Sequence, residues 1–246
     1  MTGAGFTANL LKRIYLRERR DAVEVDVLGF RMKLEPAECI DGGLLFYPHL
    51  YEHHEIAFLK RNLRSGDVFL DIGANIGFYS LIASPIVGNQ GMVLAIEADP
   101  YNYQKLIMNL KVNNIENVQV LNVGVSHKEE VLRLGLNVTG NRGGNSFLST
   151  SKHGIHVNCY PLSALLKSNH IDKIRGAKFD IEGFEFRVLD GFFNDADDSL
   201  YPNFIIIEQN PEFKEKAGGN AIDLLMRKGY HIEWSGKYNH IMALSK

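Results

Sequence analysis

The segment VFLDIGANIGFYSLIA, residues 68–83, constrains the fold of this chain more than any other. It begins as a short apolar run, turns at an acid and two glycines, and continues with apolar residues at helical spacing. Glycine permits a tight turn and a close backbone approach, and the start of a helix presents free N–H groups. The segment therefore predicts a strand, a ligand-binding turn and a helix, as at the carboxyl edge of a parallel sheet.

Strand-like and helical segments alternate through most of the remaining chain. Strands are expected at 68–71, 92–97, 118–123, 177–181 and 203–208, and helices at 50–64, 76–84, 101–113, 161–170, 184–191 and 219–228. Such alternation indicates βαβ units and a parallel sheet. Near the C-terminus, two strand-like segments are separated only by Ser235, Gly236 and Lys237, so they must pair antiparallel. The expected fold class is α/β with a mostly parallel sheet.

Two regions depart from this alternation of strands and helices. Residues 127–160 alternate around a centre rich in glycine and asparagine, which predicts an inserted β-hairpin flap. Before the sheet, residues 24–34 predict a hairpin around Gly29, and residues 6–20 predict a basic amphipathic helix. That helix either docks on the domain or contacts an anionic membrane surface or an anionic substrate. We divide the chain into an extension at 1–49 and a main domain at 50–246.

Composition narrows the possible partners and compartment. Hydrophobic residues make up 45% and charged residues 23%, which is ordinary for a globular protein with an apolar core. The net charge of −2 lacks the basic excess of most nucleic-acid-binding domains, so we expect no nucleic-acid partner. The two cysteines, Cys39 and Cys159, form no metal or redox motif and suit a reducing compartment. With no membrane-spanning segment or apolar leader, a cytoplasmic protein is expected.

The residues around the turn indicate which ligand it would bind. Glu97 ends the next strand, where an acid can accept hydrogen bonds from both ribose hydroxyls. Asn75 and Phe78 replace two glycines of the dinucleotide pattern, and no lysine follows Gly77 as in a P-loop. Asp71 would repel a pyrophosphate, but it suits S-adenosylmethionine, whose amino group and sulfonium carry positive charge.

Three segments together, DIGANIGFYS, IEADP and KFDIEGFEFRVLDG, resemble the FkbM family of S-adenosylmethionine-dependent methyltransferases. The resemblance covers roughly residues 50–210 and implies a Rossmann-like, seven-stranded class I methyltransferase sheet. It also implies O-methylation of a hydroxyl on a sugar, a glycan or another natural product. The cofactor contacts that it implies are Asp71, Gly73, Asn75, Gly77 and Glu97, to which we add Asp180 because it ends a strand facing the methyl group.

Acidic residues at two further strand ends are the candidates for chemistry. Asp180 follows one apolar strand, Glu182 lies in the next turn, and Glu208 ends the following strand. A hydroxyl is a poor nucleophile at neutral pH, so a base or a metal must help to deprotonate it. With Asn210, Asp180 and Glu208 could hold Mg²⁺ or could hydrogen-bond a polyol directly, and we favour the polyol. Glu185 either joins this group or only stabilises a helix N-terminus.

The flap adds possible contacts, and the function keeps its alternatives. Substrate contacts from the flap would be Asn141, Arg142, Asn145 and Ser146, unless the flap touches no ligand. Besides the O-methyltransferase, a non-catalytic module that binds S-adenosylmethionine and a methyltransferase acting on nitrogen are possible. A nucleic-acid methyltransferase is disfavoured by the net charge of −2. The intact acids at Asp180, Glu182 and Glu208 favour an enzyme.

Overall fold

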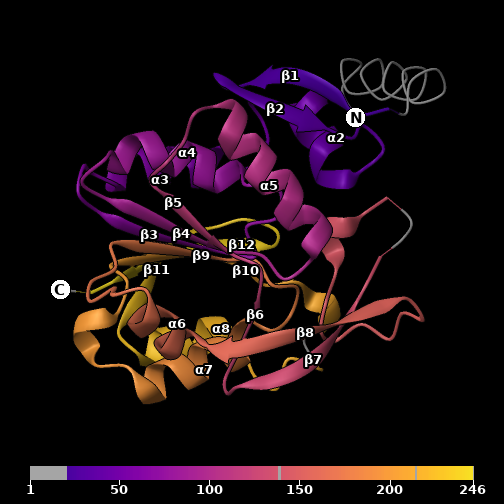
Figure 1. Ribbon diagram of the computed structural model, residues 1–246. Coiled ribbons are helices and arrows are strands. Elements are labelled where there is room, and N and C mark those ends of the chain that lie inside the picture. The colour runs from indigo at the N-terminus through magenta and orange to yellow at the C-terminus, as the bar shows by residue number, and fades with distance from the viewer. Residues whose placement is uncertain (1–20, 138–139, 214, 246) are drawn as a thin grey trace.

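A seven-stranded sheet forms the centre of the computed structural model, which describes residues 21–137, 140–213 and 215–245. Its strand order is β11-β12-β10-β9-β3-β4-β5 (Figure 1). The parallel strands are β3 (Val68–Ile72), β4 (Met92–Ile96), β5 (Val118–Leu121), β9 (Gly176–Phe179) and β10 (Phe204–Glu208). At one edge, β12 (Asn239–Leu244) pairs antiparallel with β10 and with β11 (Tyr230–Ser235). The expected mostly parallel sheet with an antiparallel C-terminal pair is confirmed.

Helices cover both faces of the sheet (Figure 1). One face carries α3 (His53–Asn62), α4 (Phe78–Val87) and α5 (Pro100–Val112), and the other carries α6 (Leu162–Ser168), α7 (Glu185–Asp195) and α8 (Ala221–Arg227). Because side chains alternate along a strand, Phe69 packs in the first layer and Leu70 in the second. The same alternation places Asp71 and its cross-strand partner Lys178 on the α4 side of the sheet.

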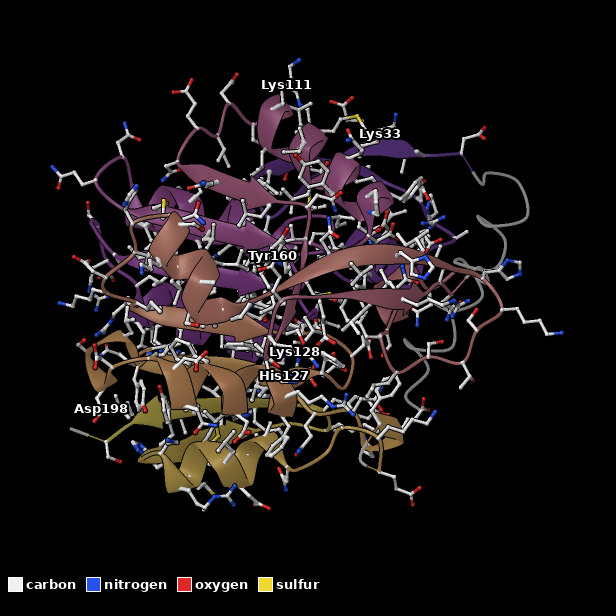
Figure 2. All side chains as sticks on the ribbon, turned by 60° about the horizontal axis from the view of Figure 1, so that its bottom comes forward. Lys33, Lys111, His127, Lys128, Tyr160 and Asp198 are labelled. Atoms are coloured by element: carbon white, nitrogen blue, oxygen red, sulfur yellow. The ribbon has the colours of Figure 1, made fainter. Side chains whose placement is uncertain are left out.

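The N-terminal hairpin joins this core through α5. It consists of β1 (Val23–Val27) and β2 (Phe30–Leu34), and α2 (Cys39–Phe46) follows it. The outer edge of β2 is satisfied by asparagine side chains: Lys33 N donates to Asn109 Oδ1 at 3.0 Å, and Arg31 N donates to Asn113 Oδ1 at 2.9 Å. Figure 2 shows Lys33 and Lys111 at the same end of the molecule. The predicted helix at 6–20 lies outside the described residues, and the division at residue 49 stays a prediction.

The insertion forms a small sheet of its own. Strands β7 (Glu130–Gly135) and β8 (Gly154–Pro161) pair antiparallel, which confirms the expected hairpin, and β6 (Gly124–Ser126) adds to β8 in parallel. The turn between β6 and β7, labelled at His127 and Lys128 in Figure 2, lies against α7, because a Cβ on Gly191 would be 2.9 Å from His127 Cα. Short 3₁₀ turns complete the fold at η1 (Arg142–Gly144), η2 (Asp198–Leu200) and η3 (Pro211–Phe213).

Candidate active site

The glycine turn after β3 brings two strand ends into direct contact. Gly73 has a φ of +78°, and a Cβ there would lie 1.9 Å from the carbonyl oxygen of Asp180. Gly77, with a φ of +88°, precedes α4, and Asn75 also takes a left-handed conformation, with a φ of +50°. Only a residue without a side chain fits at Gly73. The turn therefore lies directly against the backbone of Asp180, at the carboxyl edge of the sheet.

Asp71, in the strand that precedes this turn, hydrogen-bonds the helix that follows it. Its side chain is buried, and Ser80 Oγ in α4 donates to Asp71 Oδ2 at 2.6 Å. Burial raises the pKa of Asp71, although the Ser80 hydrogen bond and the charge of Lys178 oppose the change. Asp71 also lines a second cavity beneath the turn. Its predicted contact with the cofactor stays a prediction.

Glu97 connects the turn to the segment after β4. Its Oε2 accepts from the backbone N–H of Asn75 at 2.8 Å, and its Oε1 accepts from the N–H of Asp99 at 2.7 Å. Burial raises the pKa of Glu97 to about 7, and these two backbone hydrogen bonds oppose that rise. Each carboxylate oxygen can accept one more hydrogen bond, which is what a vicinal diol requires.

A cavity beside Glu97, which we call the nucleoside cavity, has about 550 Å³ of empty space when the open solvent at its mouth is included. The polar groups at its edge come from Gly73, Asn75, Glu97 and Asp180. Its apolar walls are Ile72, Ile96, Val123, Val125, Leu134, Phe147 and Ile181. An apolar slot with a carboxylate at one side suits a purine base joined to a ribose, so this cavity fits the nucleoside part of S-adenosylmethionine.

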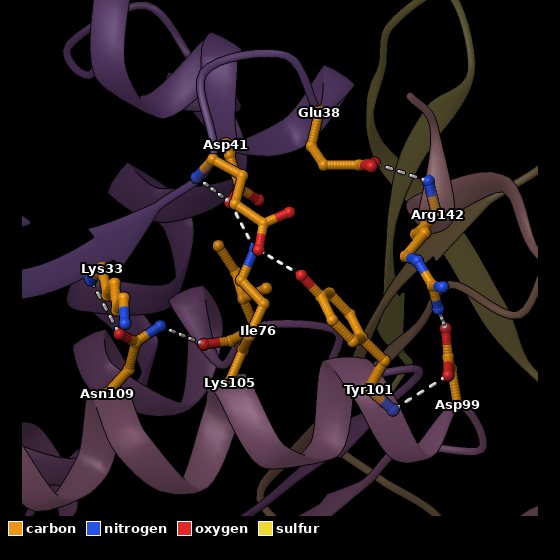
Figure 3. Close-up of polar contacts among 10 residues, drawn as sticks. Lys33, Glu38, Asp41, Ile76, Asp99, Tyr101, Lys105, Asn109 and Arg142 are labelled. Atoms are coloured by element: carbon orange, nitrogen blue, oxygen red, sulfur yellow. Dashed lines mark hydrogen bonds and ion pairs between the residues drawn. The ribbon is translucent and has the colours of Figure 1, made fainter. Parts of the chain in front are cut away.

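The flap closes the outer side of this nucleoside cavity. Arg142 Nη1 contacts Asp99 Oδ2 at 3.0 Å (Figure 3). The Arg142 guanidinium also lies 4.2 Å from the ring centre of Tyr101, and Asn145 Nδ2 donates to the same Asp99 oxygen at 2.8 Å. Arg142 N also donates to Glu38 Oε2 at 2.8 Å, which connects the flap to α2. Asp99 was not among the predicted site residues, although its place before Pro100 is typical of a helix N-cap.

The four flap residues proposed as substrate contacts take different places. Arg142 and Asn145 line the nucleoside cavity, whereas Asn141 lines neither of the two cavities described here. The Ser146 hydroxyl donates to the backbone oxygen of Glu182 at 2.7 Å, so it holds the flap against the loop after β9. The position of the flap thus favours contact with the cofactor, and a contact with the acceptor stays a prediction.

Lys178 is a buried cation that the sequence interpretation left without a role. Its side chain is 4% exposed, and Nζ lies 2.5 Å from Asp180 Oδ2 and 4.8 Å from the ring centre of Tyr79. Burial alone would lower the pKa of Lys178, but the carboxylates of Asp180 and Glu52 raise it above its ordinary value. A lysine within a buried strand requires such a partner, which is the signal that could have identified it.

The three acids predicted to be catalytic come together. Asp180, Glu182 and Glu208 each place one carboxylate oxygen within 4.8 Å of the others. Glu208 lies beside Asp180 because β10 pairs with β9 in the register Ile207 to Phe179. The expected group of Asp180, Glu208 and Asn210 stays a prediction, and a hydrogen bond from the Asn210 side chain acts to lower the pKa of Glu182.

One negative charge dominates this acidic cluster. Burial would raise the pKa of Asp180, but the Lys178 ammonium and a hydrogen bond from Glu208 hold it below its ordinary value. The charge of Asp180, together with burial, raises the pKa of Glu208 to about 11. Burial and neighbouring carboxylates raise the pKa of Glu182 to about 8. Near neutral pH, Asp180 is the ionised member and the other two retain protons.

Comparison with known proteins places this site in a family. Residues 71–232, well over half of the chain, match the family model described as the methyltransferase FkbM domain. The chain therefore belongs to the FkbM methyltransferase family, as its motifs indicated, and it is an S-adenosylmethionine-dependent methyltransferase of the class I fold. The comparisons give no support to Mg²⁺.

The individual matches cover several kinds of methyl acceptor. A probable cobalt-precorrin-6B C(15)-methyltransferase from Sulfolobus acidocaldarius is 35% identical over 66 residues, which are 27% of this chain and 34% of that protein. A putative rRNA methylase from Clostridium thermocellum has 13% identity and a TM-score of 0.49, over 79% of this chain and 96% of its own. A putative O-methyltransferase from Klebsiella pneumoniae has 12% identity and a TM-score of 0.49, over 80% and 81%.

These matches correct one expectation about partners. We expected no nucleic-acid partner from the net charge, and we withdraw that exclusion as wrong, because structures described as rRNA methylases are among those that match this chain. The similarity does not decide which partner this chain has. The predicted membrane contact rested on residues 6–20, outside the described residues. Within residues 21–137, 140–213 and 215–245, no helix is long and apolar enough to cross a bilayer.

Proposed function

We propose that this protein transfers the methyl group of S-adenosylmethionine to a hydroxyl of a sugar, a glycan or a related natural product. The observation that carries the proposal is the ionised Asp180 carboxylate, held by Lys178 at 2.5 Å, beside the nucleoside cavity. Glu97 would receive the ribose hydroxyls, and the apolar walls would hold the adenine. The cofactor, when bound, supplies an electrophilic methyl group on a positively charged sulfur.

Asp180 would orient the acceptor hydroxyl and take its proton. Its lowered pKa makes it a weak base, but a hydroxyl becomes strongly acidic as its oxygen gains the methyl group. A weak base can therefore accept the proton late in the transfer, and an ionised carboxylate opposite a sulfonium also stabilises the separated charges. Glu182 and Glu208, both protonated near neutral pH, can donate hydrogen bonds to neighbouring hydroxyls of a polyol.

A panel of acceptors tests this function. The protein would be incubated with S-adenosylmethionine carrying a labelled methyl group and with sugars, lipid-linked glycans, amines and RNA, and products would be read by mass spectrometry. We expect the label on a hydroxyl-bearing compound. Label on an amine or on RNA would contradict the proposal. Tight cofactor binding without transfer to any acceptor would instead favour the non-catalytic module.

A further inference from the structure

Three consecutive residues of the flap touch both halves of the candidate site. Asn145 and Phe147 line the nucleoside cavity. Ser146 lies between them, is 1% exposed, and donates from Oγ to the backbone oxygen of Glu182 at 2.7 Å. Glu182 belongs to the acidic cluster. Residues 145–147 therefore connect the nucleoside cavity to the acids that would meet the acceptor.

The Ser146 hydroxyl has a fixed direction. The backbone of Ser146 pairs with Gly135 of β7, with N–O distances of 3.0 Å and 3.2 Å. Its Oγ also accepts from the backbone N–H of Leu148 at 3.0 Å. A hydroxyl carries a single proton, and the Leu148 N–H can only donate. The Ser146 proton is therefore left for the carbonyl of Glu182.

The backbone at Glu182 takes a conformation that needs such support. Glu182 has a φ of +50° and Gly183 a φ of +95°, both in the left-handed region. A residue with a side chain persists there only where the contacts around it impose the conformation. The loop is also tightly packed, because a Cβ on Gly183 would lie 2.4 Å from Phe213 Cβ. The hydrogen bond from Ser146 thus acts on the backbone that sets the direction of the Glu182 side chain.

We infer that Ser146 is a positioning residue for methyl transfer, which acts by holding Glu182 beside Asp180 and Glu208. In this arrangement each of the three acids has one carboxylate oxygen within 4.8 Å of the others. The inference rests on the proposed function in one respect, that Glu182 donates hydrogen bonds to hydroxyls next to the reacting one. Such contacts exist before and during the transfer, so losing them raises the acceptor KM and changes kcat little.

Crystal structures of variants bound to S-adenosylhomocysteine, the demethylated cofactor, test the positioning directly. In Ser146→Ala, we expect the Glu182 carboxyl group to lie more than 4.8 Å from the other two acids. The matched control is Ser151→Ala, because Ser151 Oγ also donates to a flap carbonyl, Leu136 O at 2.8 Å, and accepts from His153 N at 3.2 Å. The control should leave Glu182 in place. An unmoved Glu182 in Ser146→Ala would overturn the inference.

Kinetics with an acceptor from the panel test the consequence. Ser146→Ala should raise the acceptor KM about 3- to 10-fold, with kcat and S-adenosylhomocysteine affinity within about 2-fold. In a Glu182→Ala background no carboxyl group remains to be positioned, so the same change should alter KM by less than about 2-fold. Ser151→Ala should leave KM unchanged. Equal effects of Ser146→Ala in both backgrounds would show that Ser146 only anchors the flap, which would overturn the inference.

The outcomes separate this inference from the proposed function. Transfer to an amine or to RNA, or to no acceptor, would contradict the proposed function, and the crystal structures would still decide whether Ser146 positions Glu182. Movement of Glu182 without any change in the acceptor KM would contradict the inference alone. If Ser146→Ala did not fold, Ser146→Cys would give the same comparisons, because a thiol is only a weak hydrogen-bond donor.

Discussion

Glu97 shows how one side chain can combine a structural and a binding role. Its carboxylate holds the backbone of Asn75 and Asp99 and also faces the nucleoside cavity. Losing a carboxylate that makes charge-assisted hydrogen bonds costs about 1.5–3 kcal/mol of binding free energy. We expect Glu97→Ala to weaken S-adenosylhomocysteine binding about 10- to 100-fold by calorimetry. Equal affinities would show that the ribose lies elsewhere.

The same residue predicts a pH dependence of binding. The pKa of Glu97 in the cofactor-free protein is raised to about 7 by burial, and ribose hydroxyls donate to its ionised form. As pH falls from 8 to 6, Glu97 takes up a proton that must be released on binding, so affinity should weaken. Calorimetry of Glu97→Gln provides the control, because its affinity should vary much less over that range. A pH-independent affinity in the unmodified chain would contradict this account.

At the scale of elements, a buried ion pair joins the N-terminal extension to α5. Lys105 Nζ in α5 lies 2.5 Å from Asp41 Oδ2 in α2, with side chains 8% and 3% exposed (Figure 3). Removing one partner of a buried pair typically costs about 3–5 kcal/mol, because the other charge is left unpaired. Lys105→Met should therefore lower the free energy of unfolding by about that amount in urea titrations, and the double variant with Asp41→Leu should recover part of it. A loss below about 1 kcal/mol in the single variant would refute this.

The sequence predicted elements well and side-chain partnerships poorly. The strand, the glycine turn and the helix at 68–87 follow from local sequence patterns. The meeting of Asp180 and Glu208 follows from their places at the ends of adjacent strands. The parallel pairing of β6 with β8 and the Asp99–Arg142 contact join segments more than 30 residues apart, and no local period records them. The positive φ of Glu52 has no signal in its residue type, because glycine is what that conformation favours.

At the scale of the whole molecule, several buried acids make stability depend on pH. Burial raises the pKa of Glu97 and Glu185 to about 7 and that of Glu182 to about 8, from an ordinary value of 4.5. A raised pKa in the folded state gives stability that is fully present below 4.5 and is lost as pH rises through the folded value. We expect the melting temperature of the cofactor-free chain to fall between pH 6 and pH 9, and Glu182→Gln to flatten this change. A melting temperature that rises over the same range would contradict the assignment.

The central claim is that Asp180 is the ionised group that orients the acceptor and takes its proton. With an acceptor identified from the panel, the decisive measurement compares turnover of Asp180→Asn with that of the unmodified chain, beside S-adenosylhomocysteine affinity by calorimetry. The amide keeps the shape and removes the charge, so we expect turnover to fall roughly 10²- to 10⁴-fold, with affinity within about 3-fold. If Asp180→Asn kept near-normal turnover, the account of this site would be wrong.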